Sequence, residues 1–396
     1  MERIDRKLYT DRILSLLGKG EVVVLTGHRR VGKSCILECL AANLRRNDGH
    51  VLYVDMENPD YADITDFEQL NGWIKKHISE KKRNYLLIDE VQEIAHFEKT
   101  LRYWVKQPNV DIVVTGSNAM MLSSDIATVF AGRYVRVHVQ SLNYREFLEF
   151  NHIPSSTEAL AAYLRWGGLP FLCNIPADDI RTRTDYLGSI YDTIFVKDII
   201  SRKQVRNVSF LDNLARFVAD NSCKLFSANS IAKYLKNNET SVSSNTVSDY
   251  MGALCSTYMI DRVQRYDIRG KRIFEQQEKY YFEDLGIRNH LCRDKRQADL
   301  EKILENAVYI KLVNDGYTVY VGQMDGKEID FVARRGDETA YYQVSLQISS
   351  PETYDREFGN LKRIKDNYPK YVVTMDPLSP LLNDNGIRVL KAESFL

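Results

Sequence analysis

Short apolar runs alternate with segments of helical periodicity over the first 140 residues. The apolar runs have the length of buried strands, and they cover residues 21–26, 85–88, 110–114 and 134–139. Apolar side chains then recur with the spacing of one helix face at Ile36, Leu37, Leu40 and Leu44. We expect another helix over 119–131. This alternation predicts an α/β domain with an open sheet over residues 1–142.

The pattern changes twice after residue 142. Residues 143–201 have helical periodicity interrupted by Pro154, Gly167–Gly168 and Pro170, which predicts a group of short helices. Residues 202–298 then predict three short helices and a hairpin, at 210–220, 227–235, 243–254 and 259–274. A short helix, a turn, a capped helix and a hairpin are the parts of a winged helix.

The last part of the chain, residues 299–396, predicts a small α/β domain. Its expected elements are a helix, three strands, a second helix and a fourth strand, at 300–314, 317–321, 328–333, 340–346, 352–366 and 370–375. The predicted fold class is therefore α/β, with four successive parts at 1–142, 143–201, 202–298 and 299–396.

Composition agrees with a globular protein of several domains. The chain has 396 residues, of which 44% are apolar. Basic and acidic residues both number 54, so any surface that attracts nucleic acid must be local. The six cysteines include no C-x-x-C pair, which is typical of reduced thiols. Without a signal core or an apolar run of about 18 residues, we expect a cytoplasmic protein with no membrane partner.

The segment after the first strand carries the most specific chemistry. It reads G-H-R-R-V-G-K-S from Gly27 to Ser34 and matches the phosphate-binding pattern G-x-x-x-x-G-K-[ST] between a strand and a helix. Lys33 should reach the β- and γ-phosphates of a nucleotide, and Ser34 should bind Mg²⁺. The expected nucleotide-binding residues here are Gly27, His28, Arg29, Arg30, Val31, Gly32, Lys33, Ser34 and Cys35.

Two carboxylates, Asp89 and Glu90, end the apolar strand at 85–88. Ligands bind at the carboxyl ends of strands in an open α/β sheet. We expect Asp89 to hold Mg²⁺ and Glu90 to act as the base that activates water. The pair favours hydrolysis over nucleotide binding alone.

Three more residues near this site have two interpretations each. Ser117 and Asn118 follow the strand at 110–114, where they would sense the γ-phosphate or cap the next helix. Arg133 follows the helix at 119–131, where it would reach a neighbouring subunit's nucleotide as an arginine finger or satisfy carbonyls at the helix end. The arginine finger would require a homo-oligomer.

Together these motifs resemble the AAA-type P-loop domain of a large group of bacterial and archaeal ATPases, related to the signalling ATPases with numerous domains. The resemblance rests on the segments GHRRVGKS, YLLIDEVQ, VVTGSN, AGRY and LNYREF, and it continues at residues 167–170, 279–286 and 328–331. It implies ATP as the nucleotide and a helical lid at 143–201. It also implies a winged helix and a restriction-endonuclease-like C-terminal domain.

The winged helix predicts a surface for DNA or for a protein. Residues 202–275 contain 12 basic and 7 acidic residues. We expect DNA contacts from the helix at 243–254 and from the hairpin tip, through Ser243, Asn245, Thr246, Arg269, Lys271 and Arg272. That helix has no arginine suited to guanine, so protein docking stays an alternative.

The C-terminal element order resembles the PD-(D/E)xK nuclease fold, whose site combines carboxylates, Mg²⁺ and a lysine. Asp330 fits the first carboxylate position and Glu305 lies in the preceding helix, but the acid-x-lysine position reads Gln343-Val344-Ser345, so two of the three expected catalytic side chains are missing. Glutamine is a poor ligand for a hard cation, and serine cannot replace an ammonium group. We therefore expect a degenerate, non-cleaving site, in which only a displaced lysine such as Lys362 would restore activity.

The sequence predicts a Mg²⁺-dependent ATPase whose ATP cycle switches the contacts of a winged-helix and nuclease-like module, with double-stranded DNA as the favoured partner. Two alternatives stay open. One is a protein-docking signalling ATPase without DNA contact, and the other is an ATP-regulated DNA nuclease.

Overall fold

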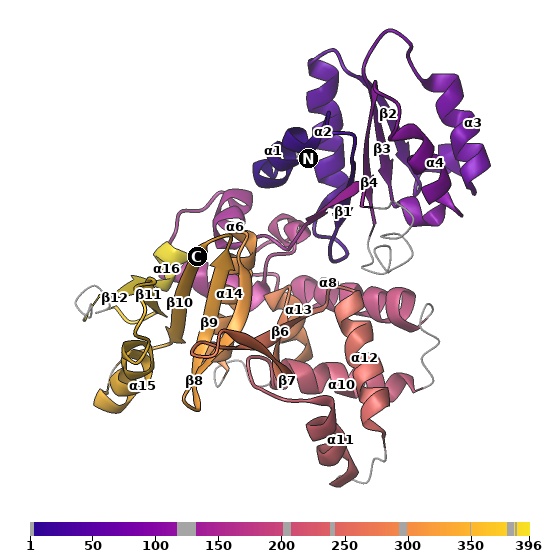
Figure 1. The fold of residues 1–396 in the computed structure, drawn as a ribbon. Coiled ribbons are helices and arrows are strands. Elements are labelled where there is room, and N and C mark those ends of the chain that lie inside the picture. Colours follow the sequence, from indigo (N-terminus) through magenta and orange to yellow (C-terminus); the bar gives the residue numbers. More distant parts are fainter. Residues whose placement is uncertain are drawn as a thin grey trace. The chain divides into compact units, whose positions relative to one another are not determined.

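The computed structural model describes residues 4–116, 132–200, 207–237, 242–292, 299–348, 350–377, 384 and 386–396. The chain divides into two compact units, whose elements are labelled in Figure 1. Unit 1 comprises Met1–Gln140 and Ser256–Tyr258, and unit 2 comprises Ser141–Cys255 and Met259–Leu396.

Unit 1 is built on a parallel five-stranded sheet in the order β2-β3-β4-β1-β5. Its strands are β1 (Val22–Thr26), β2 (His50–Asp55), β3 (Asn84–Asp89), β4 (Val110–Thr115) and β5 (Tyr134–His138). The central strands β1 and β4 are buried along their whole length, which explains their continuous apolar runs. Because the strands are parallel, the carboxyl ends of β1, β3 and β4 meet at one edge of the sheet.

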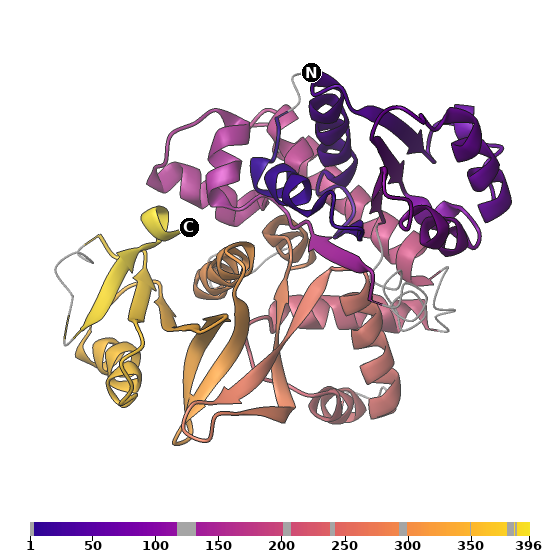
Figure 2. The ribbon, with the colours of Figure 1, turned by 45° about the horizontal axis from the view of Figure 1, so that its top comes forward.

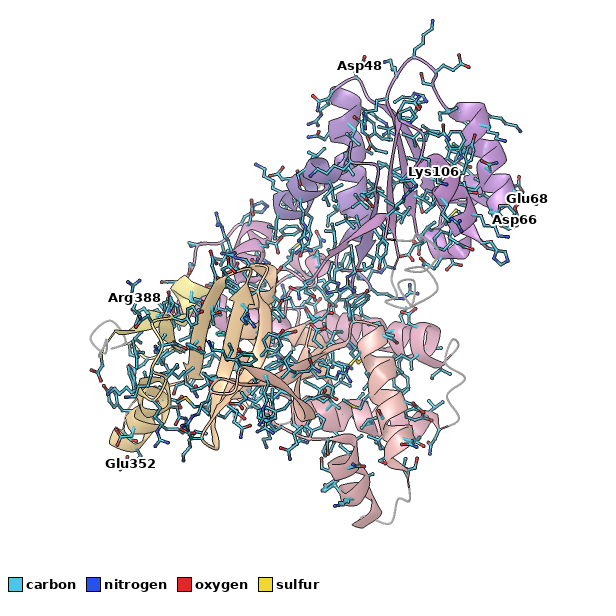
Figure 3. The ribbon with its side chains drawn as sticks, in the orientation of Figure 1. Asp48, Asp66, Glu68, Lys106, Glu352 and Arg388 are labelled. Atoms are coloured by element: carbon cyan, nitrogen blue, oxygen red, sulfur yellow. The ribbon has the colours of Figure 1, made fainter. Side chains whose placement is uncertain are left out.

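Helices cover both faces of this sheet. They are α1 (Lys7–Leu16), α2 (Lys33–Arg46), α3 (Phe67–His77) and α4 (Phe97–Trp104), with short 3₁₀ turns η1 (Pro59–Tyr61) and η2 (Val91–Glu93). Figure 1 shows α1 and α2 on one side of the sheet and α3 and α4 on the other. A capping box of Asp66 and Gln69 starts α3, and Figure 3 shows Asp66 and Glu68 at this end. Leu70, Leu101 and Trp104 pack from α3 and α4 into the core of the sheet.

Unit 2 begins with a helical region. It contains α6 (Tyr144–Asn151), α7 (Thr157–Trp166), η4 (Pro170–Asn174), α8 (Ile180–Thr193), the π-helix η5 (Ile194–Ile200), α10 (Val208–Asp220), α11 (Ala228–Asn237), α12 (Ser244–Ser256) and α13 (Leu285–Leu291). The helical character expected over 143–200 and the three helices expected over 210–254 are confirmed. Nowhere in the described ranges is a helix long and apolar enough to cross a membrane.

Glycines of the segments 167–170 and 279–286 allow these two parts of unit 2 to approach each other closely. The N–H of Gly168 donates to Asp284 Oδ2 at 2.9 Å, and Asp284 also caps α13. A Cβ on Gly167, whose φ is +74°, would lie 2.3 Å from the backbone nitrogen of Gly286. The close approach of the two backbones therefore requires glycine.

A seven-stranded sheet forms the rest of unit 2, in the order β12-β11-β10-β9-β8-β6-β7. The strands are β6 (Ile260–Asp267), β7 (Arg272–Phe282), β8 (Thr318–Met324), β9 (Lys327–Arg335), β10 (Glu338–Ser345), β11 (Lys370–Thr374) and β12 (Ile387–Lys391). The hairpin β6–β7 joins the C-terminal strands because β6 pairs in parallel with β8 (Figure 2). The borders expected at 201/202 and 298/299 thus fall inside unit 2.

Two helices cover opposite faces of the C-terminal part of this sheet. The helix α14 (Leu300–Asn314) packs Leu304 and Val308 against Phe331 on one face. On the other face, α15 (Pro351–Lys362) packs Phe358 and Leu361 in a second apolar core. The chain ends in α16 (Ala392–Phe395), which the sequence did not predict.

Candidate active site

The loop between β1 and α2 has a backbone that its glycines permit. Gly27 has φ +141° and Gly32 has φ +96°. A Cβ on Gly27 would lie 2.0 Å from the carbonyl oxygen of Val139. Because α2 begins at Lys33, the loop leads directly into a helix N-terminus, where free N–H groups and the helix dipole favour an anion. The loop therefore has the geometry of a phosphate-binding site.

Lys33 and Arg6 hold this loop from two sides. Lys33 is buried, and its Nζ donates to the carbonyl oxygens of Gly27 and His28, both at 2.9 Å. Arg6 is buried too, and its Nη1 donates to the carbonyls of Val31 at 3.0 Å and Gln140 at 2.7 Å. No local motif marks Arg6, so this role could not be predicted from the residues around it.

Asp89 and Glu90 lie at the carboxyl end of β3, and Thr115 connects them to β4. The Thr115 hydroxyl donates to Asp89 Oδ1 and accepts the backbone N–H of Glu90 at 2.9 Å. Glu90 has a left-handed backbone conformation, with φ +51°, and its carboxylate accepts from the Gln92 amide. Thr115 therefore fixes both acidic residues, a role that the sequence did not assign to it.

The site has the oxygen ligands that Mg²⁺ requires. The exposed Ser34 hydroxyl hydrogen-bonds to the buried Asp89 carboxylate. Burial raises the pKa of Asp89, and the nearby Glu90 and Asp55 raise it further, against the hydrogen bonds from Ser34 and Thr115. A divalent cation would relieve this concentration of negative charge. Serine and carboxylate oxygens are suitable ligands for it, so the residues present fit the metal.

Of the other residues expected at this site, the structure describes only Arg133. Ser117 and Asn118 are outside the described residues. Arg133 is exposed, and its carbonyl accepts the N–H of Val22 at the start of β1. The phosphate-binding loop follows the other end of β1, so Arg133 and the loop of the same chain lie at opposite edges of the sheet.

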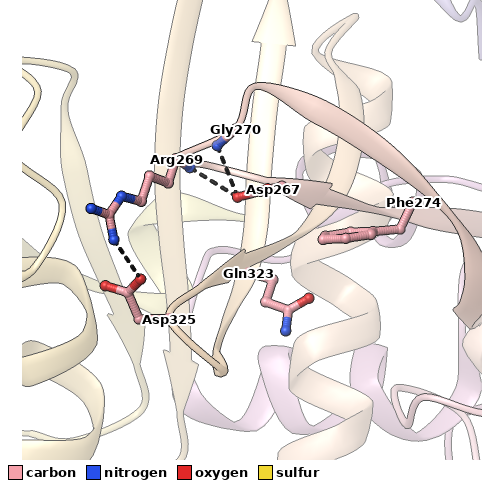
Figure 4. A pocket seen from close by; sticks show the side chains of 6 residues that line it. All are labelled: Asp267, Arg269, Gly270, Phe274, Gln323 and Asp325. Carbon is pink, nitrogen blue, oxygen red and sulfur yellow. Dashed lines mark hydrogen bonds and ion pairs between the residues drawn. The ribbon is translucent and has the colours of Figure 1, made fainter.

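The residues expected to contact DNA are partly engaged within unit 2. Ser243 caps α12 by accepting the N–H of Thr246 at 3.1 Å, while Asn245 is exposed. At the hairpin tip, Arg269 pairs with Asp325 at 3.2 Å and Arg272 pairs with Asp267 at 3.4 Å. Figure 4 shows the open pocket at this tip, of about 330 Å³, lined by Asp267, Arg269, Gly270, Phe274, Gln323 and Asp325. Carboxylates therefore offset two of the three expected cations.

Two of the residues expected to form a degenerate nuclease site, Glu305 and Asp330, lie near a lysine that the sequence motifs did not indicate. Lys279 of β7 lies 2.9 Å from Glu305 and 4.0 Å from Asp330. Gln343 Oε1 accepts the N–H of Asp330 at 3.3 Å, and the Ser345 hydroxyl donates to the carbonyl of Gln347.

The sequence suggested Lys362 as a displaced lysine, but the lysine near these acids in the structure is Lys279. Lys362 forms an ion pair with Asp384. Lys279 belongs to the segment 279–286, whose only signal in the sequence is the family resemblance, and no spacing rule links it to Asp330.

Comparison with known proteins agrees with this geometry. Residues 19–148 match the AAA domain family, and residues 157–298 match a domain of unknown function (DUF8612). A Walker-type ATPase of Pyrococcus abyssi is similar in structure over 73% of this chain and 96% of that chain, with a TM-score of 0.51 and 15% identity. This likeness concerns the fold.

Two relatives are similar over most of their length. An uncharacterized protein of Methanocaldococcus jannaschii is 25% identical over 394 residues, which cover 94% of this chain and 85% of the relative. An uncharacterized protein of Haemophilus influenzae is 34% identical over 381 residues, which cover 94% of this chain and 93% of the relative. The chain therefore has an AAA-type P-loop ATPase domain and belongs to the same family as the Haemophilus influenzae protein.

Proposed function

We propose that the chain hydrolyses ATP with Mg²⁺ and that the ATP cycle switches contacts made by unit 2, with double-stranded DNA as the partner. The observation that carries the ATPase proposal is the meeting of Lys33, Ser34, Asp89 and Glu90 at one edge of the sheet, with Thr115 fixing both acids.

The residues at this edge of the sheet have separate roles in phosphoryl transfer to water. Lys33 turns from the carbonyls of Gly27 and His28 to the β- and γ-phosphates. Ser34 and Asp89 would hold Mg²⁺, which would supply positive charge to neutralise the phosphates. Glu90 takes a proton from the attacking water, and its backbone hydrogen bond to Thr115 keeps it at the sheet edge.

The DNA proposal rests on element order and on local charge. The helices α10, α11 and α12 followed by the hairpin β6–β7 have the order of a winged helix. The order of α14, β8, β9, β10, α15 and β11 is that of the nuclease-like fold, which we propose to be non-cleaving. The ion pairs at the hairpin tip favour modest affinity, and protein docking is the second candidate.

Arg133 extends the proposal to an assembly. Because it is exposed at the sheet edge opposite its own phosphate-binding loop, it suits the site of a neighbouring copy better than its own. Mixing Lys33→Ala with Arg133→Ala tests this, since each variant supplies what the other lacks. Activity of the mixture well above the sum of the two separate activities supports a shared site, and strictly additive activity contradicts it.

Phosphate release measured across protein concentration tests the ATPase proposal. Lys33→Ala and Glu90→Gln should each lose roughly 10²- to 10⁴-fold in kcat. Glu93→Gln, which changes an exposed acid three residues after Glu90, is the matched control and should retain wild-type activity. Equal phosphate release from wild type and both site variants would remove the proposal.

Duplex binding at several salt concentrations tests the DNA partner. Arg269→Ala with Lys271→Ala should weaken binding and reduce the slope of log affinity against log salt by roughly 2. Lys75→Ala with Lys76→Ala, exposed on α3, is the control. Unchanged binding in the first pair would exclude the hairpin tip, and no binding by wild type would favour protein docking. Nicking of plasmid with Mg²⁺ or Mn²⁺ would instead favour the nuclease.

A further inference from the structure

A lysine is buried among carboxylates in unit 2. The side chain of Lys279 is only 2% exposed. Its Nζ lies 2.9 Å from Glu305 Oε1, 2.7 Å from Glu328 Oε1 and 4.0 Å from Asp330 Oδ1. These groups come from β7, α14 and β9, so the sheet and its covering helix bring them together. We refer to Lys279, Glu305, Glu328 and Asp330 as the acidic cluster.

The carboxylates of the acidic cluster are held in place by neutral donors. Tyr281 donates its hydroxyl to Glu305 Oε1 at 2.7 Å. The backbone N–H of Val344 donates to Asp330 Oδ2 at 2.8 Å. These bonds orient the acids toward Lys279, since each acid also has an oxygen facing the ammonium group.

Negative charge exceeds positive charge around this lysine. Next to the cluster lies Glu357, which is 1% exposed and adds to the electrostatic field at Asp330. Its Oε1 accepts from Arg356 at 2.7 Å, and its carboxylate also accepts a hydrogen bond from the Gln343 side chain. Lys279 therefore faces three carboxylates, while Arg356 pairs with Glu357 and also with Glu301 at 3.3 Å. A buried group of carboxylates is stable only when a cation or protons compensate it.

An ammonium group can take the place of a hard metal ion here. It is a compact cation with three N–H donors, and two of its partners lie at hydrogen-bond distance. Among the described residues, the one group of three metal-type ligands within 4.8 Å of one another is Asp220, Cys292 and Asp299. The acids around Lys279 do not form such a group, and the oxygens of Glu305 and Glu328 lie 2.9 and 2.7 Å from the ammonium nitrogen instead.

We propose that Lys279 is the resident cation of the acidic cluster, in the place that a divalent metal would otherwise occupy, and that removing its ammonium group creates a divalent-cation site. The inference concerns unit 2 alone and does not depend on ATP hydrolysis. It accounts for the missing acid-x-lysine pair, since a cluster that carries its own cation needs no metal for stability. Lys279 is also too buried to position a water for attack on DNA.

Mn²⁺ titration of nucleotide-free protein tests the proposal, with thermal unfolding and Mn²⁺ paramagnetic resonance as readouts. All variants carry Asp89→Asn, which removes the proposed cation site of unit 1, and in this background the protein with Lys279 intact should melt at the same temperature in EDTA and in Mn²⁺. Lys279→Met should melt lower in EDTA and gain roughly 5 °C or more in excess Mn²⁺. Lys279→Met with Asp330→Asn should lose this gain, because one carboxylate ligand is removed.

The control is Lys311→Met, which removes a lysine paired with Asp315 on α14 outside the cluster. It should show no response to Mn²⁺. The proposal is overturned if the protein with Lys279 intact binds Mn²⁺ and loses it in Asp330→Asn, or if Lys279→Met shows no response. Should Lys279→Met fail to fold in EDTA, it is refolded with Mn²⁺: recovery supports the proposal, and no recovery overturns it.

Discussion

The two acidic sites of this molecule each contain a buried lysine, and they use it differently. In unit 1, Lys33 donates to the carbonyls of Gly27 and His28, while Asp89 accepts from the hydroxyls of Ser34 and Thr115. In unit 2, Lys279 donates directly to Glu305 and Glu328.

This difference decides what each site can bind. A hydroxyl is a neutral partner that can itself become a metal ligand, so Asp89 and Ser34 remain available to Mg²⁺. An ammonium group among carboxylates already supplies the positive charge, and displacing it would leave a buried cation without a partner. Similar residue types therefore give an open site in one unit and a closed site in the other.

The largest expected effect is on the rate of ATP hydrolysis, which should depend on the acids of unit 1 and not on those of the acidic cluster. Asp89→Asn should lower the rate of ATP hydrolysis roughly 10²-fold or more, because it removes a carboxylate from the metal. Asp330→Asn makes the same change in the acidic cluster and should leave the rate within about twofold. Phosphate release is the measurement, and equal losses in the two variants would break the comparison.

The next effect concerns stability and its dependence on pH. Lys279→Met should cost about 3–5 kcal/mol near neutral pH, because it leaves buried carboxylates without their cation. Burial raises the pKa of Asp330, of Glu305 and of Glu357. The folded state therefore takes up protons at higher pH than the unfolded chain, so acidification stabilises it. Lys279 lowers the pKa of Glu305 and of Asp330, so its removal raises both further, and the variant gains more stability on acidification than wild type does.

The deficit of Lys279→Met relative to wild type should accordingly shrink as the pH falls from 8 toward the ordinary carboxylate pKa. Urea unfolding at several pH values measures this. A deficit that is constant over the whole range would mean that lost packing, and not uncompensated charge, causes the instability.

A smaller effect is expected at the residue that connects the acids of unit 1. Thr115→Val removes the hydroxyl that joins Asp89 to the backbone of Glu90, and it should lower kcat roughly 10- to 100-fold. Thr100→Val is the matched control, since the Thr100 hydroxyl is buried in the same unit and donates to the carbonyl of Phe67. If both variants lose the same activity, Thr115 has only a structural role.

The smallest expected effect is a loss of stability when one hydrogen-bond donor of the acidic cluster is removed. Tyr281→Phe removes the hydroxyl that donates to Glu305 Oε1 and should cost about 1 kcal/mol of unfolding free energy. Lys279 donates to the same oxygen, so the cost should differ when it is measured in Lys279→Met. Additive costs in the double variant would show that the two donors act independently.

The residues proposed for the site of unit 1 could be chosen from the sequence because their signals are local. Eight consecutive residues carry the phosphate-binding loop, and Asp89 and Glu90 directly follow an apolar run. Thr115 was not singled out, since its role depends on the pairing of β3 and β4, which are separated by a helix. Arg6 was missed for a similar reason: it contacts a loop 25 residues away, and no local sequence pattern indicates that contact.

The site of unit 2 was recognised only in part because it depends on distant pairing. The hairpin was expected to end at Phe274, whereas β7 continues to Phe282 and carries Lys279. Parallel pairing of β6 with β8 then places this strand in the C-terminal sheet. Asp330 could be predicted from element order, and Glu305 was expected in the same site, but their cation comes from a strand that precedes both.

The parallel pairing of β6 with β8 also affects how the protein can be divided for experiments. A fragment that begins at residue 299 would lack β6 and β7, so the backbone N–H and C=O groups of β8 would lose their partners along one side. Exposed strand edges of this kind promote aggregation. A soluble fragment of the C-terminal region should therefore begin before Ile260, and one that begins at 299 should precipitate or form edge-to-edge oligomers.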